Sequence, residues 1–261
     1  MLRRRLLIIT MMLSLLAATA FAQNGASGKS FVQAASEERM YTVTVYSAKP
    51  EMWTESLQFI KNEVVPANVK GGRKHMEVWT SVFGQSYEAW FILPLENFAS
   101  MDKPDETLLK GLGSREAVAA FWHKARSLNT SVRQFVIKVR PELSFIKPDA
   151  PTPRLASFSM VEVAYGREAE AHSLIKSEWI PALKKSGRNG TLRASIVAGD
   201  VTGYVTFTPR ENFAELDQPG ATEQALGKDG ERKAVAKFAG TITRIERRTL
   251  LLRTDLSILP K

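Results

Sequence analysis

Two strand-like segments at 190–208 carry the polar side chains with the clearest chemical capacity. Arg193 offers a guanidinium that could hold a carboxylate or an enolate, and Tyr204 offers a phenol that could donate or accept a proton. The matching segments at 74–93 are mainly apolar on one face. An apolar wall facing a few converging polar groups is typical of a small-molecule pocket. The candidate ligand-binding residues are therefore Arg193, Ser195, Tyr204, Thr206, Val78 and Phe91.

The remaining titratable residues do not form a recognisable catalytic or metal-binding motif. The three histidines, His75, His123 and His172, share no spacing typical of a zinc site. His172 falls on an apolar helical face and is interpreted as a half-buried core residue, whereas His75 stands beside two basic residues and is expected in solvent. The chain has no cysteine, so disulfides, thiolate metal sites and cysteine nucleophiles are excluded. The catalytic residues, if there are any, stay unknown.

A long internal repeat dictates how these residues are positioned. Residues 59–104 align without a gap with residues 174–219, and 17 of the 46 aligned positions are identical. Both copies contain Glu-x-x-Pro-Ala followed by Pro-x-Glu-Asn-Phe-Ala. Glu63 and Glu178 recur at the same place in the two copies. Because catalysis needs one site only, this recurrence indicates a structural task such as a helix-terminal ion pair.

The hydrophobic periodicity alternates in the same order within each copy. Alternating residues predict strands, and apolar residues at i, i+4, i+7 and i+11 after Pro50 predict a helix. A Gly-Asp turn at Gly199 marks a hairpin. The elements expected in the first copy are strand 41–46, helix 50–64, strands 74–83 and 87–93, helix 116–126 and strand 134–139; strands 190–198, 201–208 and 249–253 are counterparts.

This β-α-β-β-α-β order, found twice, is that of the ferredoxin-like split βαβ unit. One such unit covers a single face of its sheet with helices and leaves the other face bare. Together with the two recurring motifs, the order resembles the dimeric α+β barrel superfamily, which includes the antibiotic-biosynthesis monooxygenase, NIPSNAP and EthD-like families. The resemblance covers residues 40–258 and implies an α+β fold. In it, two tandem ferredoxin-like units would close an intramolecular pseudo-dimeric barrel, and the protein would be a monomer.

The hairpin register predicts which residues share a face. If the turn has two or four residues, positions whose numbers sum to 169 pair, such as Val78 with Phe91. We expect the face with these two residues to meet the face with Arg193 and Tyr204 across the barrel interior. The opposite faces, including Leu192, Ala194, Val205 and Phe207, should then lie under the helices. Trp79 and Trp90 are likewise interpreted as core residues beneath helices.

The resemblance implies two activities that can be compared with particular residues. Quinone monooxygenases of this superfamily need no cofactor and use Asn, Trp, Tyr and Arg around an aromatic substrate; this chain has the tryptophans but no asparagine in its first strand. Haem-degrading members use a histidine of the second helix, and His123 lies on that helix, again without the asparagine. We therefore expect no cofactor, with haem bound through His123 as the alternative.

Both the N-terminus and the central connection fall outside the two copies. Residues 1–22 combine three arginines, an apolar run and Ala-Phe-Ala, which predicts a cleaved signal peptide. Residues 23–39 are expected to form a flexible tether. The first copy then spans 40–145, a proline-rich linker 146–154, and the second copy 155–261. The protein is accordingly expected to be exported, either periplasmic or secreted, with no membrane contact after cleavage.

Composition narrows the class of partner. The chain carries a formal net charge of +9, but its basic residues are dispersed rather than clustered. A nucleic-acid-binding surface would gather them into a patch, so no nucleic-acid partner is expected. The sequence thus predicts an exported small-molecule-binding protein of undetermined ligand. A cofactor-independent monooxygenase or isomerase acting on an aromatic or enolisable substrate is the alternative.

Overall fold

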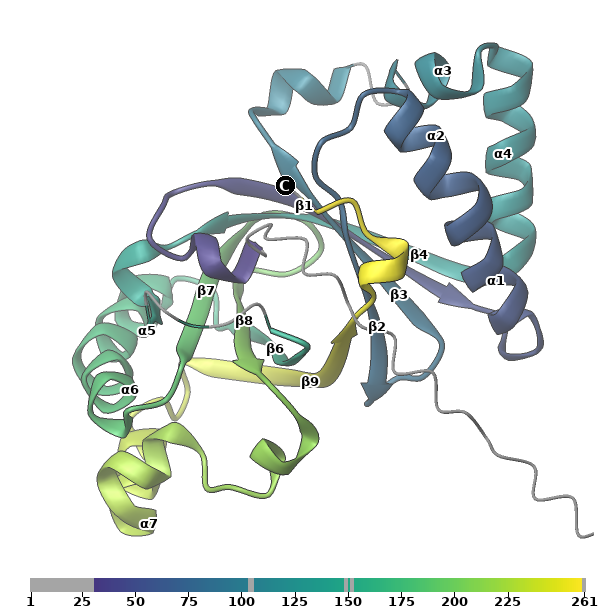
Figure 1. Ribbon diagram of the computed structural model, residues 1–261. Coiled ribbons are helices and arrows are strands. Elements are labelled where there is room, and N and C mark those ends of the chain that lie inside the picture. The colour runs from purple at the N-terminus through teal and green to yellow at the C-terminus, as the bar shows by residue number, and fades with distance from the viewer. Residues whose placement is uncertain (1–30, 103–105, 148–149, 151–152, 260–261) are drawn as a thin grey trace, which may run out of the picture.

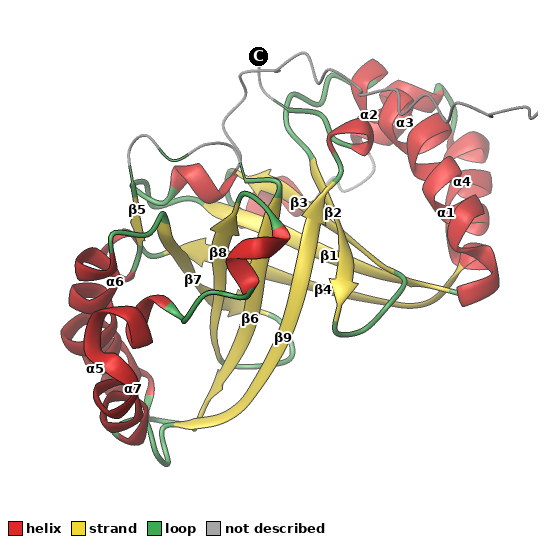
Figure 2. Ribbon diagram, turned by 60° about the horizontal axis from the view of Figure 1, so that its bottom comes forward, coloured by secondary structure: helices red, strands yellow, loops and turns green. Residues whose placement is uncertain are grey.

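The computed structural model describes residues 31–259 except 103–105, 148–149 and 151–152. The segment expected as a signal peptide, residues 1–22, lies outside the described residues. The protein is an α+β fold in which eight antiparallel strands close a barrel. Figures 1 and 2 show the helices gathered in two layers on opposite sides of these strands. No helix of the described residues has the length and apolar character needed to cross a membrane.

The strands follow the order β4-β1-β3-β2-β9-β6-β8-β7 around the barrel, and β7 pairs with β4 to close it. The pairings β2–β9 and β4–β7 join the two halves of the chain. A two-residue strand, β5 (Phe145–Ile146), pairs with the first two residues of β7. The barrel strands are β1 (Met40–Ala48), β2 (Glu77–Phe83), β3 (Glu88–Leu95), β4 (Asn129–Val139), β6 (Leu155–Val163), β7 (Gly190–Ala198), β8 (Gly203–Arg210) and β9 (Ile242–Leu252).

Each half of the chain supplies one helical layer. The helices of the first layer are α1 (Trp53–Phe59), α2 (Val65–Lys70), α3 (Glu106–Leu112) and α4 (Arg115–Leu128). Those of the second are α5 (Glu168–Leu174), α6 (Ile180–Ser186) and α7 (Ala221–Ala236), the last interrupted at Gly227. In Figure 1 the first layer lies at the upper right and the second at the lower left.

A π-helical turn separates α1 from α2, and another separates α5 from α6. The turns span Ile60–Val64 and Ile175–Trp179, and Pro66 and Pro181 follow them at matching positions. Proline has no N–H for the carbonyl four residues earlier, and its ring collides with that carbonyl in a regular α-helix. The wider turn relieves this collision, so the recurring proline explains the recurring irregularity.

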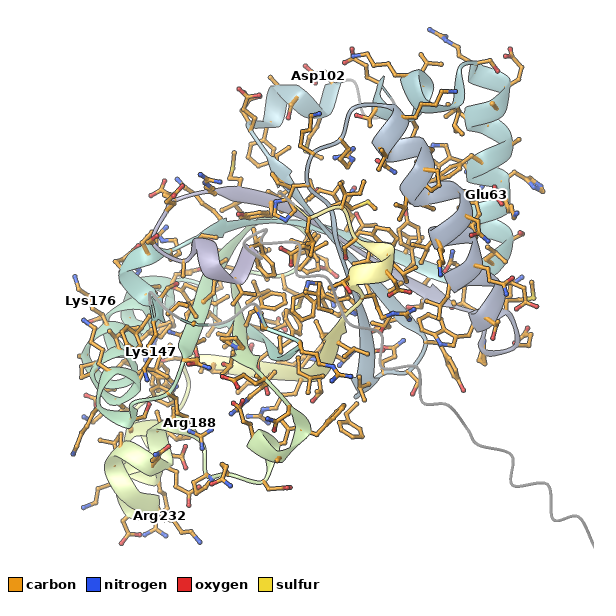
Figure 3. All side chains as sticks on the ribbon, viewed as in Figure 1. Glu63, Asp102, Lys147, Lys176, Arg188 and Arg232 are labelled. Atoms are coloured by element: carbon orange, nitrogen blue, oxygen red, sulfur yellow. The ribbon has the colours of Figure 1, made fainter. Side chains whose placement is uncertain are left out.

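The recurring glutamates form equivalent ion pairs, which confirms their expected structural task. Glu63 pairs with Lys124 of α4, and Glu178 pairs with Lys237 just after α7 at 2.7 Å. Each pair ties the first helical segment of a layer to the last one. Figure 3 shows Glu63 on the outer side of the first layer.

Large aromatic side chains from both halves fill the barrel interior. Trp90 packs on Phe158 with ring centroids 4.6 Å apart, and Phe158 packs on Phe207 at 5.0 Å. Trp79 is fully buried in the same cluster. The indole N–H groups of Trp79 and Trp90 donate to Glu77 and Glu88 at 3.0 and 3.1 Å, so their polar atoms are satisfied.

The first described residues, Phe31 and Val32, are part of this core. Residues 23–39 were expected to be a tether with little to bury, but Phe31 and Val32 are instead 1% and 0% exposed. The Phe31 ring lies 5.5 Å from Tyr41 and 4.6 Å from Phe207 in edge-to-face geometry. Since Tyr41 belongs to β1 and Phe207 to β8, this short segment contacts both halves of the protein.

The predicted hairpin register is confirmed, but the predicted orientation of the faces is wrong. Val78 pairs with Phe91, whose numbers sum to 169. The Val78 face packs beneath the first helical layer with Ile60, while Trp79 and Trp90 face the barrel interior. The second half is reversed in the same way: Leu192, Ala194, Val205 and Phe207 fill the interior, and Tyr204 packs under the second helical layer. Both faces of each sheet are buried, so apolar composition could not distinguish inside from outside.

Candidate functional site

Two cavities lie between the barrel and its helical layers. The larger, about 430 Å³, is beneath α1–α4 and is called the first cavity. The smaller, about 180 Å³, is beneath α5–α7 and is called the second cavity. The filled barrel interior separates the two, so the candidate residues of the two halves do not converge on one pocket.

Arg193 is the dominant polar residue of the second cavity. It is 5% exposed, and its Nη1 donates to the Leu143 carbonyl at 2.8 Å. Burial lowers the pKa of its guanidinium to about 10, with a smaller opposing effect from Tyr204 and none from an acidic side chain of the described residues. By contrast, the part-buried Arg248 has a carboxylate partner, Glu88, at 3.1 Å. Arg193 is therefore a buried cation without a described counter-ion.

Tyr204 and Thr206 line the second cavity together with Arg193. Thr206 stands directly opposite Arg193 in the β7–β8 ladder, so their side chains share a face. Burial raises the pKa of the Tyr204 phenol, an effect that Arg140 and Arg193 partly offset. A raised pKa keeps the phenol protonated at neutral pH, which makes Tyr204 a hydrogen-bond donor rather than a base.

Ser195 lies beside the second cavity in a shallower depression that Tyr204 also lines. His172 is in this depression, half-buried as the sequence predicted, and its Nε2 is 3.9 Å from Glu142. Arg140 holds the same carboxylate at 2.8 Å. Glu142 follows the C-terminal end of β4, and no local pattern in the sequence predicted that it lies near His172.

Apart from Ser159 and Arg247, the rest of the second cavity is apolar, and two large rings narrow it. Trp179 and Phe238 pack edge to face with centroids 4.8 Å apart. The described residues that complete its lining are Ser159, Val161, Val163, Ala171, Ile175, Ile242, Ile245 and Arg247.

The first cavity contains Phe91 but not Val78, which is fully buried beside it. Its polar lining includes three residues that the sequence reasoning missed: Asn129, Gln134 and Tyr46. Asn129 follows the end of α4 and Gln134 lies on the outward face of β4. The signal for Gln134 was the alternation of strand 134–139, which was recognised as a strand but never assigned to a face; Asn129 lies outside that expected strand.

Comparison with known proteins identifies the fold alone. No protein-family profile and no curated protein matches the sequence. An anthrone oxidase-like protein has a similar structure, with a TM-score of 0.59 at 10% identity over 84% of this chain and 93% of that one. The chain has the dimeric α+β barrel fold.

Two further solved structures share this fold. A candidate monooxygenase from Fusobacterium nucleatum has a TM-score of 0.52 at 10% identity, covering 82% of this chain and 92% of that one. A candidate chlorite dismutase has a TM-score of 0.51 at 13% identity, covering 84% and 96%. At these identities the likeness concerns the arrangement of the chain and not its reaction.

The expectation that no cofactor is involved is corrected by these comparisons. Besides the candidate chlorite dismutase, a mutant chlorite dismutase from Candidatus Nitrospira defluvii has a TM-score of 0.51 at 12% identity, covering 84% of this chain and 93% of that one. The comparisons therefore contradict the expectation that the protein works without a cofactor. The side chain that the sequence suggested for binding haem, His123, does not fit this role either. His123 is exposed on α4 and does not line the first cavity, so it cannot reach a group bound there.

Proposed function

We propose that this protein binds a small, partly apolar anion in the second cavity, with Arg193 holding the anionic group. The supporting observation is a guanidinium that is 5% exposed, lines a cavity and meets no carboxylate among the described residues. Removing a cation from water carries a penalty of roughly several kcal/mol. A bound carboxylate would offset this penalty through a charge-assisted, bidentate hydrogen bond.

The neighbours of Arg193 suit the rest of such a ligand. Tyr204 and Thr206 supply hydroxyl groups beside the guanidinium, and Arg247 adds a second positive charge at the exposed side of the lining. Trp179, Phe238 and Ile175 form an apolar end. This combination favours a compact carboxylate with one hydrocarbon or aromatic group.

The proposal extends to where the protein works and in what form. The arginines and apolar run of residues 1–22 support export to the periplasm or medium. The β2–β9 and β4–β7 pairings support two tandem ferredoxin-like units acting as an internal pseudo-dimer, and hence a monomer. Native mass and N-terminal sequencing of the exported protein test these points.

Oxidation or isomerisation of an aromatic or enolisable substrate is the second candidate. The structures of an anthrone oxidase-like protein and a candidate monooxygenase favour it, because both have the same fold. In this case Arg193 would stabilise an enolate and Tyr204 would donate a proton to it. Product formation from a panel of aromatic ketones, with and without added haem, tests this candidate.

Calorimetric titration with benzoate and with benzamide, its neutral analogue, tests the anion site. We expect wild-type protein to prefer benzoate and Arg193→Met to lose that preference, roughly tenfold or more. Arg210→Met is the matched control, because Arg210 is a part-buried arginine at the end of β8 that does not line the second cavity and lies near Glu215. Equal affinity of benzoate for wild type and Arg193→Met would refute the proposal.

A further inference from the structure

The two cavities occupy equivalent places in the two halves of the protein. Met40 faces Lys138 in the β1–β4 ladder, and Leu155 faces Leu251 in the β6–β9 ladder. Equivalent positions therefore differ by 115 near β1 (155 − 40) and by 113 near β4 (251 − 138). The Glu63–Lys124 and Glu178–Lys237 ion pairs obey the same two shifts.

This equivalence allows the linings to be compared position by position. The following residues of the first cavity correspond to residues of the second: Thr44 to Ser159, Tyr46 to Val161, Val64 to Trp179, Phe91 to Thr206, Ala125 to Phe238, Asn129 to Ile242 and Gln134 to Arg247. Val78 corresponds to Arg193. The first half thus has Gln134 and Val78 where the second half has the cations Arg247 and Arg193. It also has the smaller Val64 and Ala125 where the second has Trp179 and Phe238.

Asn129 is the most informative residue of the first cavity. Its Nδ2 donates to the Ala125 carbonyl at 2.6 Å, which leaves Oδ1 as an acceptor. That oxygen is buried and has no hydrogen-bond partner among the described residues. Buried acceptors are rarely left without a donor. Because the other half of the protein has isoleucine at this position, the fold itself does not require an amide here.

The walls around Asn129 are suited to a flat aromatic molecule. Tyr46 and Phe91 pack edge to face at 5.4 Å, and Phe59 and Phe121 lie 5.0 Å apart. Of the described residues lining the cavity, Arg73 alone carries a charge, and its Nε is already bound to Asn68 Oδ1 at 2.6 Å. An anionic group placed against Asn129 Oδ1 would be repelled by that unpaired acceptor, whereas a neutral hydroxyl or N–H group would donate to it.

We infer that the first cavity is a second binding site, which takes a neutral aromatic molecule whose hydroxyl or N–H group donates to Asn129 Oδ1. The chain then holds two sites of opposite preference, one for an anion beneath α5–α7 and one for a neutral donor beneath α1–α4. The inference rests on the first cavity alone and is independent of ligand binding at Arg193.

The test uses three probes with one ring system and the intact protein. These are 2-naphthol, 2-methoxynaphthalene, which lacks the donor, and 2-naphthoate, which is an anion. We expect wild type to bind 2-naphthol roughly tenfold or more tightly than 2-methoxynaphthalene, because the ether leaves the buried oxygen unpaired. Equal affinity of these two probes would overturn the inference.

Two substitutions, each taken from the equivalent position of the other half, locate the site. Asn129→Ile should remove the preference for 2-naphthol over 2-methoxynaphthalene, and Ala125→Phe should block both probes by filling the cavity. Arg193→Met serves as the crossed control and should leave 2-naphthol binding unchanged. Circular dichroism checks folding, and if Asn129→Ile does not fold, Ala125→Phe and the wild-type comparison still decide. Unchanged 2-naphthol binding in a folded Asn129→Ile or Ala125→Phe variant would refute the site.

Discussion

Arg193 poses the sharpest question at the residue scale, because a buried cation without a counter-ion destabilises the protein that carries it. Val78, its equivalent, shows that the fold accepts an aliphatic side chain at this place. Replacing a buried charge by an aliphatic group of similar volume is commonly stabilising. We therefore predict that Arg193→Met raises the free energy of unfolding by about 1–2 kcal/mol at pH 7 while benzoate binding is lost. Urea denaturation without and with benzoate measures both effects; a destabilised variant would assign Arg193 a structural role instead.

The pH dependence of this difference follows from the sign of the pKa shift. Burial lowers the pKa of Arg193 from its ordinary value to about 10 in the folded protein. Between these values the unfolded chain binds more protons, so the Arg193 contribution to stability rises with pH. The advantage of Arg193→Met should accordingly be complete below pH 10 and shrink above it. Urea midpoints of both proteins at pH 8 and pH 11 test this, and a constant difference would contradict it.

Sequence reasoning could group Arg193, Tyr204 and Thr206 but could not say which way they face. The two-residue period of a strand and the hairpin register determine which residues share a side. Inside and outside are decided by packing across the barrel, where Phe31 and Phe207 meet. Asn129 was missed for a related reason, since its unpaired oxygen is visible only once its surroundings are known.

At the element scale, a close crossing of α2 and α3 forms part of the wall of the first cavity. A Cβ at Gly111 would lie 2.0 Å from the Ala67 carbonyl oxygen, and one at Gly71 would lie 2.0 Å from that of Thr107. Neighbouring Leu108 lines the cavity directly. The two glycines therefore allow the backbones to approach as closely as the cavity requires.

We predict that Gly111→Ala destabilises the protein by about 1–3 kcal/mol and weakens 2-naphthol binding. In a helix with free space at this position, the same change would stabilise the protein by roughly 1 kcal/mol. A destabilising effect would therefore show that α2 and α3 cross closely here. Lys110→Ala, on the exposed side of α3, is the control and should change stability by no more than about 0.5 kcal/mol. Urea denaturation and probe titration provide both readouts; a stabilised Gly111→Ala variant would show that α3 can move away freely.

The order of strands and helices within each half was predictable because the repeat shows each hydrophobic pattern and each turn motif twice. The recurring prolines marked the strained end of the first helical segment in both copies. They did not predict that a π-helical turn at Ile60–Val64 relieves the strain, because the form of the relief depends on which residues must stay packed against the sheet. Local propensity reports strain but not how tertiary packing relieves it.

For the whole molecule, the core shared by the two halves predicts that they unfold as a single cooperative unit. Strand pairing crosses between them twice, at β2–β9 and β4–β7. The interior cluster draws from both halves and from Phe31. Composition could not predict the role of Phe31, because the polar residues around it indicate a tether and the aromatic surface that receives it exists only after the barrel closes.

Phe31→Ala should therefore destabilise the whole protein and not just its N-terminus. Its ring contacts Tyr41 in one half and Phe207 in the other, so we predict a loss of about 3 kcal/mol. Tryptophan fluorescence and far-ultraviolet circular dichroism should follow the same single urea transition, shifted equally. Phe98→Ala is the control, since Phe98 is 48% exposed and its loss should cost about 0.5 kcal/mol or less. Transitions that separate by probe in the Phe31→Ala variant, or a loss as small as the control's, would show that the halves are stable without this aromatic contact.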